Sequence, residues 1–465
     1  MRPEIEEYNY DWLMGGVLNA ASKLAYATPK EYEYSLRYIP YFRGIADAFI
    51  SNGETGAEIL SFLSQYYANI LSARAQEKKL AMTSFSLAPV VLYAMDIVPV
   101  AIELLTTIGT LVWRRGMFDY MDFLSEAGLP ETSCSAQRGA LGAYLAKVSE
   151  KVDFVLCNTS GSCDTNANAF AFSAAYLDKP FFHLNQPSVI GSRESDHYHY
   201  QDYKNLIRFL EEQTGKKLDW DRMAQVLQEV NRQDELIAEL EDMQLMVPNP
   251  LSALFSLFIY AGQIAFCGHP RFTRMLKAMV RQTREKAVNK MSGLKSGKEK
   301  LRALVCYIDH YTVNTRFWQW MDQRGISHIG IMSKSFRDTP QNKNNFGEAV
   351  YGIDTSSPDA MINSAAQLTS RVVMIREMRG PFDAPHMWLE EALTLAKMYQ
   401  AQCFIFNTTP GCRNTWAVVK LFAREVEKHG YPMHIMNDDP WDDRVESWEM
   451  TQDRLDEFLT VRNLI

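Results

Sequence analysis

Short apolar runs, typical of buried strands, alternate along the chain with longer segments that have the spacing of amphipathic helices. The strand-like runs include 80–85, 303–308 and 402–407, and helical segments lie between them. Residues 1 to about 76 differ, because only the helical spacing occurs there. Strands that alternate with helices are typical of α/β domains, so we predict an α/β fold preceded by a helical arm.

One strand–turn–helix–strand pattern occurs twice. Residues 154–166 read FVLCNTSGSCDTN, and residues 403–415 read CFIFNTTPGCRNT. The copies share an asparagine, a threonine and a cysteine, which are Asn158 with Asn407, Thr159 with Thr408 and Cys163 with Cys412. Each copy predicts a βαβ unit whose cysteine stands where the helix begins. Because open α/β sheets bind ligands at the carboxyl ends of their strands, the two turns are expected to face one cleft.

The repeat and the helical patterns divide the chain into four segments. We predict a helical arm, a first α/β domain, a helical domain with a linker, and a second α/β domain with a terminal helix, over 1–76, 77–190, 191–300 and 301–465. The run from Arg281 to Arg302 is basic and punctuated by Gly and Ser, which favours a solvated linker over a phosphate-binding or docking surface.

Composition limits the partners and the compartment. The net charge of −8 and the pI near 5.7 argue against a general nucleic-acid-binding protein. The amino terminus lacks the basic-then-apolar layout of a signal peptide. Two apolar stretches, 85–113 and 251–267, are interrupted by polar residues or are too short for a membrane span, which needs about 20 apolar residues. We therefore expect a soluble, cytoplasmic protein without a membrane span.

Three of the seven cysteines lie in polar turns before predicted helices, namely Cys134, Cys163 and Cys412. The positive end of a helix dipole favours a thiolate, and thiolates bind metals. Their spacing contains no CxxC pair, so the residues alone leave open whether they converge on a metal or are three ordinary loop cysteines. Iron–sulfur clusters usually have four thiolate ligands, so three would leave one iron with a free position.

The order SCSAQRG, then DFVLCNTSGSCD before KPFFHLNQP, then FIFNTTPGC before YPMHIMNDD, resembles the 2-hydroxyacyl-CoA dehydratase and benzoyl-CoA reductase family. The similarity covers about residues 79–460. It implies two Rossmann-like α/β domains with an intervening helical domain, and a 4Fe–4S cluster held by Cys134, Cys163 and Cys412. It also implies a heterodimer of related subunits, a separate ATP-hydrolysing iron–sulfur activator, and an acyl-CoA substrate.

The resemblance also implies a mechanism, in which the activator delivers one electron to the thioester carbonyl. The resulting ketyl radical anion expels the hydroxyl group as water or, in the reductase branch, the aromatic ring is reduced. We therefore expect a radical 2-hydroxyacyl-CoA dehydratase subunit, a lyase. The alternatives are an aryl-CoA reductase subunit, a cluster-bearing electron-relay subunit, and a metal-free two-domain binding protein.

Four further residues are candidates for the site. Ser84 and Ser86 end the first strand, where a hydroxyl can reach the open iron or the thioester, or can form turn and N-cap hydrogen bonds. His310 follows the strand 303–308 and can polarise a carbonyl, shuttle a proton or simply be hydrogen-bonded. Arg138 can neutralise the cluster, bind a CoA phosphate or form a structural ion pair. The pair His197 and His199 is interpreted as part of a loop.

Overall fold

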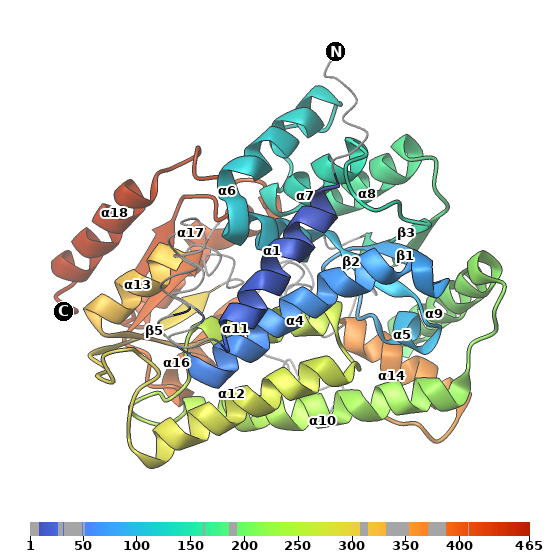
Figure 1. Ribbon diagram of the computed structural model, residues 1–465. Coiled ribbons are helices and arrows are strands. Elements are labelled where there is room, and N and C mark those ends of the chain that lie inside the picture. Colours follow the sequence, from blue (N-terminus) through green and yellow to red (C-terminus); the bar gives the residue numbers. More distant parts are fainter. Residues whose placement is uncertain are drawn as a thin grey trace.

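We describe a computed structural model of the 465-residue chain (Figure 1). The structure describes residues 9–26, 31, 49, 52–160, 163–185, 193–306, 315–331, 353–370, 387–407 and 409–465. The eight described strands are β1 (Leu80–Thr83), β2 (Val98–Ala101), β3 (Phe154–Ser160), β4 (Phe181–Asn185), β5 (Leu301–Cys306), β6 (Ile326–Ile331), β7 (Cys403–Asn407) and β8 (Met433–Met436).

The helices of the first half are α1 (Tyr10–Leu24), α4 (Gly53–Ser72), the 3₁₀ turn η2 (Arg74–Gln76), α5 (Val90–Ala94), α6 (Ile102–Glu126), α7 (Ser135–Leu145), α8 (Asp164–Tyr176) and α9 (Arg193–Thr214). Those of the second half are α10 (Trp220–Gln244), α11 (Leu254–Ala265), α12 (Pro270–Val288), α13 (Thr315–Arg324), α14 (Pro358–Ser370), α16 (Met387–Met398), α17 (Arg413–Lys428) and α18 (Trp448–Val461).

The strands form two parallel four-stranded sheets with the same order, β2-β1-β3-β4 and β6-β5-β7-β8. The predicted α/β fold with two similar sheets is therefore confirmed. We call the first sheet with α5 to α8 the first α/β unit, and the second sheet with α13 and α16 to α18 the second α/β unit. The domain boundaries assigned from the sequence stay predictions.

In each sheet the order in which strands are added changes side at the two central strands. The first unit places β2 on one side of β1 and then β3 on the other, and β5 and β7 have the same relation in the second unit. The carboxyl ends of such central strands form the usual ligand-binding crevice of an open parallel sheet. Both repeated motifs begin with one of these central strands, β3 or β7, so both cysteine turns start at a crevice.

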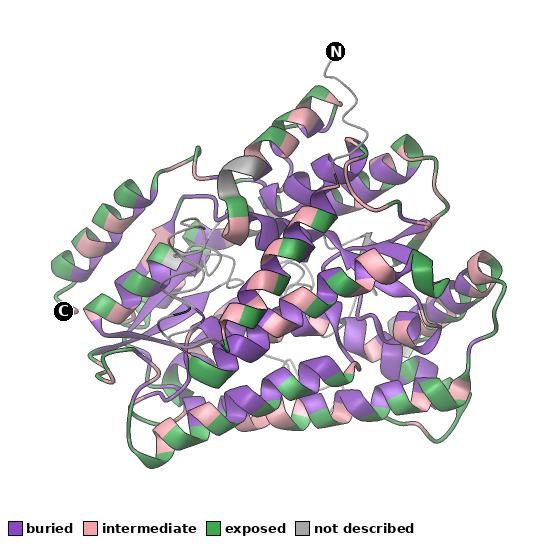
Figure 2. Ribbon diagram, viewed as in Figure 1, coloured by how far each residue is buried: buried purple, intermediate pink, exposed green. Residues whose placement is uncertain are grey.

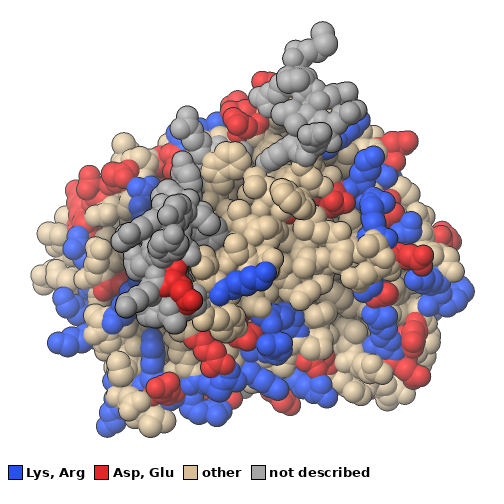
Figure 3. All heavy atoms as spheres, in the orientation of Figure 1, with Lys and Arg blue, Asp and Glu red and all other residues tan. Residues whose placement is uncertain are grey.

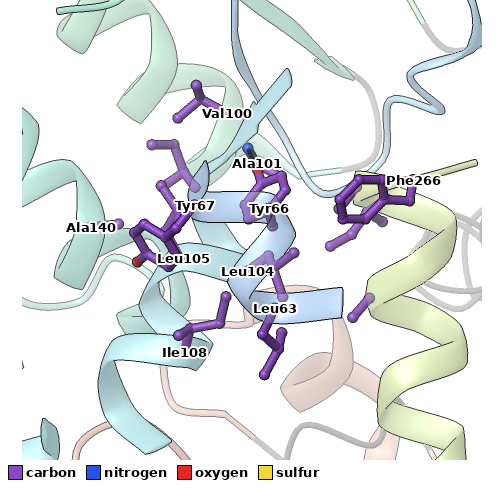
Figure 4. Packing of buried hydrophobic residues seen from close by; sticks show 14 of the residues in the cluster. Leu63, Tyr66, Tyr67, Val100, Ala101, Leu104, Leu105, Ile108, Ala140 and Phe266 are labelled. Atoms are coloured by element: carbon purple, nitrogen blue, oxygen red, sulfur yellow. Dashed lines mark hydrogen bonds between the residues drawn. The ribbon is translucent and has the colours of Figure 1, made fainter. Parts of the chain in front are cut away.

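The largest hydrophobic core packs the arm and α11 against the first sheet (Figure 4). Figure 4 shows Tyr66 and Tyr67 of α4 beside Leu104 and Leu105 of α6, with Phe266 close to Tyr66. The backbone N–H of Ala101 donates a 2.6 Å hydrogen bond to the Tyr66 hydroxyl, which fixes α4 to the end of β2. Full burial of each large apolar side chain contributes about 1.5–3 kcal/mol, so the arm is part of the first unit's core.

Only the first part of the basic run predicted as a linker is helical, because α12 ends at Val288 and residues 289–300 form turns and loop before β5. Figure 1 shows α10 and α12 side by side, and Figure 3 shows positive and negative side chains interspersed on the visible face of the molecule. Arg281 pairs with Glu54 at 2.5 Å, and Arg284 pairs with Glu239 of α10. Acidic partners on neighbouring helices thus hold these charges, and the periodic apolar positions of α12 that pack into the core favour the helix.

Helix α14 shows that the two halves of the chain interlock. Met361 and Ile362 of α14 pack with Tyr203 and Leu206 of α9 in a second core that also contains α5 and α10. Figure 2 shows buried residues continuous through the centre and exposed residues on the outer faces of α10, α12 and α18. Among the described residues, no helix has the length and apolar character that a membrane crossing requires.

Candidate functional site

All three turn cysteines occupy the same local position, the residue immediately before a helix. Cys134 is the N-cap of α7, Cys163 the N-cap of α8 and Cys412 the N-cap of α17. None of the three makes a side-chain capping bond to its helix. The sequence-based placement of the cysteines at helix starts is therefore confirmed, and their sulfurs are not used as caps.

The three cysteines line one pocket, which we call the cysteine pocket. Its volume is about 660 Å³ including its opening. The first unit contributes Cys134 and Cys163, the second contributes Cys412, and α11 closes one side with Leu257, Ala261 and Ile264 among others. Residues that are 29 and 249 positions apart in the sequence thus meet where the carboxyl edges of the two sheets face each other.

Burial decides the protonation of the two thiols of the first unit. It raises the pKa of Cys163 to about 12. It also raises the pKa of Cys134 well above its ordinary value, with further contributions from the nearby Cys163, Asp439 and Cys412. For Cys134 and Cys163, loss of hydration therefore opposes the stabilisation of a thiolate that was expected from the helix dipole. A bound cation would reverse this balance.

The second unit closes the pocket by packing tightly against the first unit. A Cβ atom on Gly411 would lie 2.6 Å from Cys134 Cα, so only glycine allows this approach. The Ser135 hydroxyl donates a 2.6 Å hydrogen bond to Asp439 Oδ1. The indole N–H of Trp441 donates at 3.1 Å to Thr107 Oγ1 of α6. These contacts hold the turn of Cys412 against the turn of Cys134.

Asp439 is the centre of this closure. Its Oδ1 also accepts hydrogen bonds from the backbone N–H groups of Trp441 at 3.0 Å and Asp442 at 3.2 Å. Burial raises the pKa of Asp439 to about 6, and the hydrogen bond from Ser135 opposes the rise. Asp439 therefore forms a structural latch between the two units.

Ser84 and Ser86 lie at the crevice of the first sheet but do not line the cysteine pocket. Both side chains are fully buried. The Ser84 hydroxyl donates a 2.7 Å hydrogen bond to Asn158 Oδ1, and the Ser86 hydroxyl donates to the same oxygen. Asn158 Nδ2 donates in turn to the Ser86 carbonyl oxygen at 2.8 Å. The repeated asparagine thus fixes the loop between β1 and α5, while the residue between the serines, Phe85, lines the pocket.

The other sequence candidates lie elsewhere. Arg138 donates hydrogen bonds to the carbonyl oxygens of Met121 and Glu131 and to Ser125 Oγ. It therefore connects α7 with α6 and with the loop that follows α6. His197 and His199 belong to α9, so their interpretation as loop residues is wrong. The His199 ring contacts the carbonyl oxygens of Asn185 and Ala366, at 2.9 Å and 3.1 Å. His310 lies outside the described residues.

Glu103 is a pocket residue that the sequence did not single out. It lies in the first turn of α6, is 7% exposed and lines the cysteine pocket. Burial raises its pKa to about 8, opposed in part by a 2.6 Å hydrogen bond from Asn166 Nδ2. A single acidic residue within the apolar run 97–105 was the available signal, but it reads equally well as an ordinary interruption of a hydrophobic stretch.

The cysteine pocket presents three thiols, the ligand type of iron–sulfur clusters. No group of three or more His, Cys, Asp or Glu side chains is placed to hold one metal ion in the part of the chain that the structure describes. Three soft thiol ligands at one cavity are the chemistry that such a cluster requires.

A family model described as 2-hydroxyglutaryl-CoA dehydratase, D-component, matches residues 87–461. The match includes all three pocket cysteines, Glu103 and Asp439, whereas Ser84 and Ser86 precede it. The comparison with curated proteins found no match.

Proposed function

The chain belongs to the 2-hydroxyglutaryl-CoA dehydratase D-component family, and we propose that it is a subunit of an enzyme that removes water from a 2-hydroxyacyl-CoA thioester. Cys134, Cys163 and Cys412 would hold a 4Fe–4S cluster. The observation that carries this proposal is the meeting of these three cysteines, each at a helix start, in one pocket between the two α/β units. When bound, such a cluster supplies low-potential electrons and an iron with an open coordination position.

The reaction removes hydroxide from the α-carbon and a proton from the β-carbon, so its products are an enoyl thioester and one water. The β-hydrogen of a saturated thioester is not acidic, and hydroxide is a poor leaving group next to a carbonyl carbon. One electron added to the thioester carbonyl makes that carbon electron-rich and favours loss of the hydroxyl. That electron is recovered after the proton has left, so the overall reaction is redox-neutral.

Glu103 has the properties required of the general acid and base in this reaction. Its carboxyl lies at the pocket, and with a pKa of about 8 it is mostly protonated at pH 7. In that form it can donate a proton to the departing hydroxyl group, and the resulting carboxylate can accept the β-proton. Asn166, three residues after Cys163, holds the carboxyl in place through its hydrogen bond. The apolar side chains of α11 exclude water from the same space.

The proposal includes partners. The D-component description names one component of a larger enzyme, so we infer a complex with a second, related subunit. An ATP-dependent iron–sulfur activator would deliver the electron.

The test is anaerobic purification of the complex, followed by electron paramagnetic resonance with and without a 2-hydroxyacyl-CoA. The expected result is roughly four irons per cluster-bearing chain and a signal that shifts when the thioester is added. Product analysis with a 2-hydroxyacyl-CoA and an aromatic acyl-CoA separates a dehydratase from an aryl-CoA reductase. A cluster that ignores both thioesters would contradict catalysis by this subunit and favour an electron relay.

A second experiment addresses Glu103. Glu103→Gln should keep the iron content of the wild type, because Glu103 is not among the proposed ligands, and should lower turnover by about a hundredfold or more. An unchanged rate together with an unchanged pH profile would exclude Glu103 from the proton transfer. Glu241→Gln changes another buried glutamate, on α10 and outside the pocket, and serves as the control.

A further inference from the structure

The cysteine pocket contains a buried amide that the proposed reaction has not used. Gln137 lies in the first turn of α7, three residues after Cys134, and lines the pocket. It is 1% exposed, and its side-chain oxygen Oε1 has no hydrogen-bond partner among the described residues. A buried amide without a partner is unfavourable for folding, so such groups are uncommon and call for an explanation.

Three other buried amides among the described residues, Asn158, Asn166 and Gln233, have partners. Asn158 Oδ1 accepts from Ser84 and Ser86, and Asn166 donates to Glu103. Gln233 of α10 donates to the carbonyl oxygen of His269 at 3.0 Å and accepts from the Gly268 N–H at 2.9 Å. Gln137 differs from these in facing a cavity, which is where a ligand would supply the partner.

The backbone around Gln137 is rigidly held. Its N–H donates a 3.1 Å hydrogen bond to the Cys134 carbonyl oxygen. Helix α7 packs closely on α6, since a Cβ on Gly139 would lie 2.6 Å from Thr106 Cγ2 and one on Gly142 would lie 2.1 Å from the Tyr120 carbonyl oxygen. The amide is therefore presented from a fixed helix, which reduces the entropy that a ligand contact has to overcome.

We propose that Gln137 binds the 2-hydroxyacyl group of the substrate and selects for its hydroxyl. A carboxamide carries a donor and an acceptor on one carbon. A 2-hydroxyacyl thioester carries an acceptor carbonyl and a donor hydroxyl on adjacent carbons. The amide N–H donates to the thioester carbonyl oxygen, and the 2-hydroxyl donates to Oε1. This inference rests on the proposed function and specifies its substrate class, because an acyl or aromatic acyl thioester without the 2-hydroxyl leaves Oε1 unpaired.

The experiment measures binding by the anaerobically purified complex. Equilibrium dialysis compares a 2-hydroxyacyl-CoA with the same acyl-CoA lacking the hydroxyl, for the wild type and for Gln137→Leu. The wild type should prefer the hydroxylated ligand. Gln137→Leu should bind it about tenfold to a hundredfold more weakly and should lose less affinity for the deoxy ligand, which makes only the carbonyl contact with the amide N–H. Equal binding of both ligands by variant and wild type would overturn the proposal.

Measurements of stability and metal content distinguish substrate binding by Gln137 from a structural role and from a role at the metal. Gln137→Leu should keep the wild-type melting temperature, because no hydrogen bond of Oε1 is lost, whereas Gln233→Leu should lower it. A fall for Gln137→Leu as large as that for Gln233→Leu would show a structural role instead. Iron content and the thioester-free paramagnetic signal should also stay unchanged, and a change in either would place Gln137 at the metal and overturn the proposal. Wild-type protein that binds neither thioester would refute the proposed function itself.

Discussion

The two sheets have the same strand order but contribute differently to the pocket between them. The first unit supplies two of the three cysteines together with Glu103 and Gln137. The second supplies one cysteine, and its other contacts there come from Gly411, Asp439 and Trp441, which press against the first unit. The two copies of the motif therefore share a cysteine at a helix start, together with an asparagine and a threonine, while the residues around them have different roles.

The two units therefore have different roles at the pocket. Polar groups able to contact a substrate lie on helices α6 and α7 of the first unit, which are anchored by the arm and the large core. The second unit positions its cysteine by fitting a glycine against the backbone of Cys134. The cysteine pocket is formed by both α/β units. Substitutions where the two units meet should therefore change the pocket more than substitutions within either sheet.

The largest predicted effect concerns the arm, which is attached to the first unit. Asp11 of α1 is buried, accepts a 2.8 Å hydrogen bond from the Glu150 N–H, and burial raises its pKa from 3.8 to about 7. The folded state then binds the proton more tightly than the unfolded state does. The stabilisation from protonated Asp11 is complete below about pH 4 and is lost as the pH rises through about 7.

Asp11→Asn should remove this dependence. The difference between 3.8 and about 7 corresponds to roughly 4 kcal/mol at most. Relative to the wild type, the variant should gain up to that amount in free energy of unfolding between pH 4 and pH 8, measured by urea unfolding. Asp119→Asn, at an exposed position on α6, is the control. Parallel pH curves for Asp11→Asn and the wild type would contradict the buried carboxyl.

The contact between the units is tested by Gly411→Ala. The added Cβ would meet the Cys134 backbone, which should lower the free energy of unfolding by about 1–3 kcal/mol and reduce bound iron. Gly16→Ala is the matched control, because its Cβ would meet nothing within 4 Å and alanine favours the exposed helix α1. Normal iron content in Gly411→Ala would show that the close approach is not required.

The latch at Asp439 predicts a similar or smaller effect. Ser135→Ala removes a buried 2.6 Å hydrogen bond between the units and should cost about 1–3 kcal/mol of unfolding free energy. Asp439 keeps its two backbone donors, which limits the loss. Ser22→Ala removes an exposed bond within the arm and should change stability little. A difference between the two variants near zero would argue against a latch at this contact.

The smallest effect is expected at the ion pair between the helices that follow the two repeated cysteines. Arg413 of α17 and Asp164 of α8 lie 3.2 Å apart with side chains 62% and 56% exposed. A double-mutant cycle with Arg413→Gln and Asp164→Asn should give a coupling of about 0–1 kcal/mol that disappears in high salt. A larger, salt-resistant coupling would mean that this pair, and not Gly411 and Asp439, joins the units.

The sequence predicted those features that depend on local patterns. The duplicated motif predicted both parallel sheets and the cysteines at helix starts, because strand runs and turn residues are encoded within about a dozen positions. The N-cap of α10 is equally local, because the side chain of Asp219 accepts hydrogen bonds from the N–H groups of Asp221 and Arg222. The helical start of the basic run was not predicted, because its Arg281 and Arg284 pair with Glu54 and Glu239, which lie on helices distant in the sequence.

The site was only partly predictable for the same reason. The local sequence does not identify Glu103 or Gln137 as functional residues, since their importance comes from sharing a cavity with three cysteines. The raised pKa of Cys163 depends on burial, which local pattern does not give. Ser84 and Ser86 lie beside Asn158 rather than at the pocket, because the short loop after β1 turns Phe85 toward it. Their catalytic role and that of His310 stay predictions.

The central claim is that Cys134, Cys163 and Cys412 hold one metal cluster across the two units. Iron and sulfide should be measured in anaerobically purified variants in which each of these cysteines is changed to alanine. Cys306→Ala, which changes a fully buried thiol inside β5, is the control. The account predicts that each pocket variant loses most of its iron and sulfide while Cys306→Ala keeps the wild-type content. Equal iron in all four variants, or none in the wild type, would contradict it.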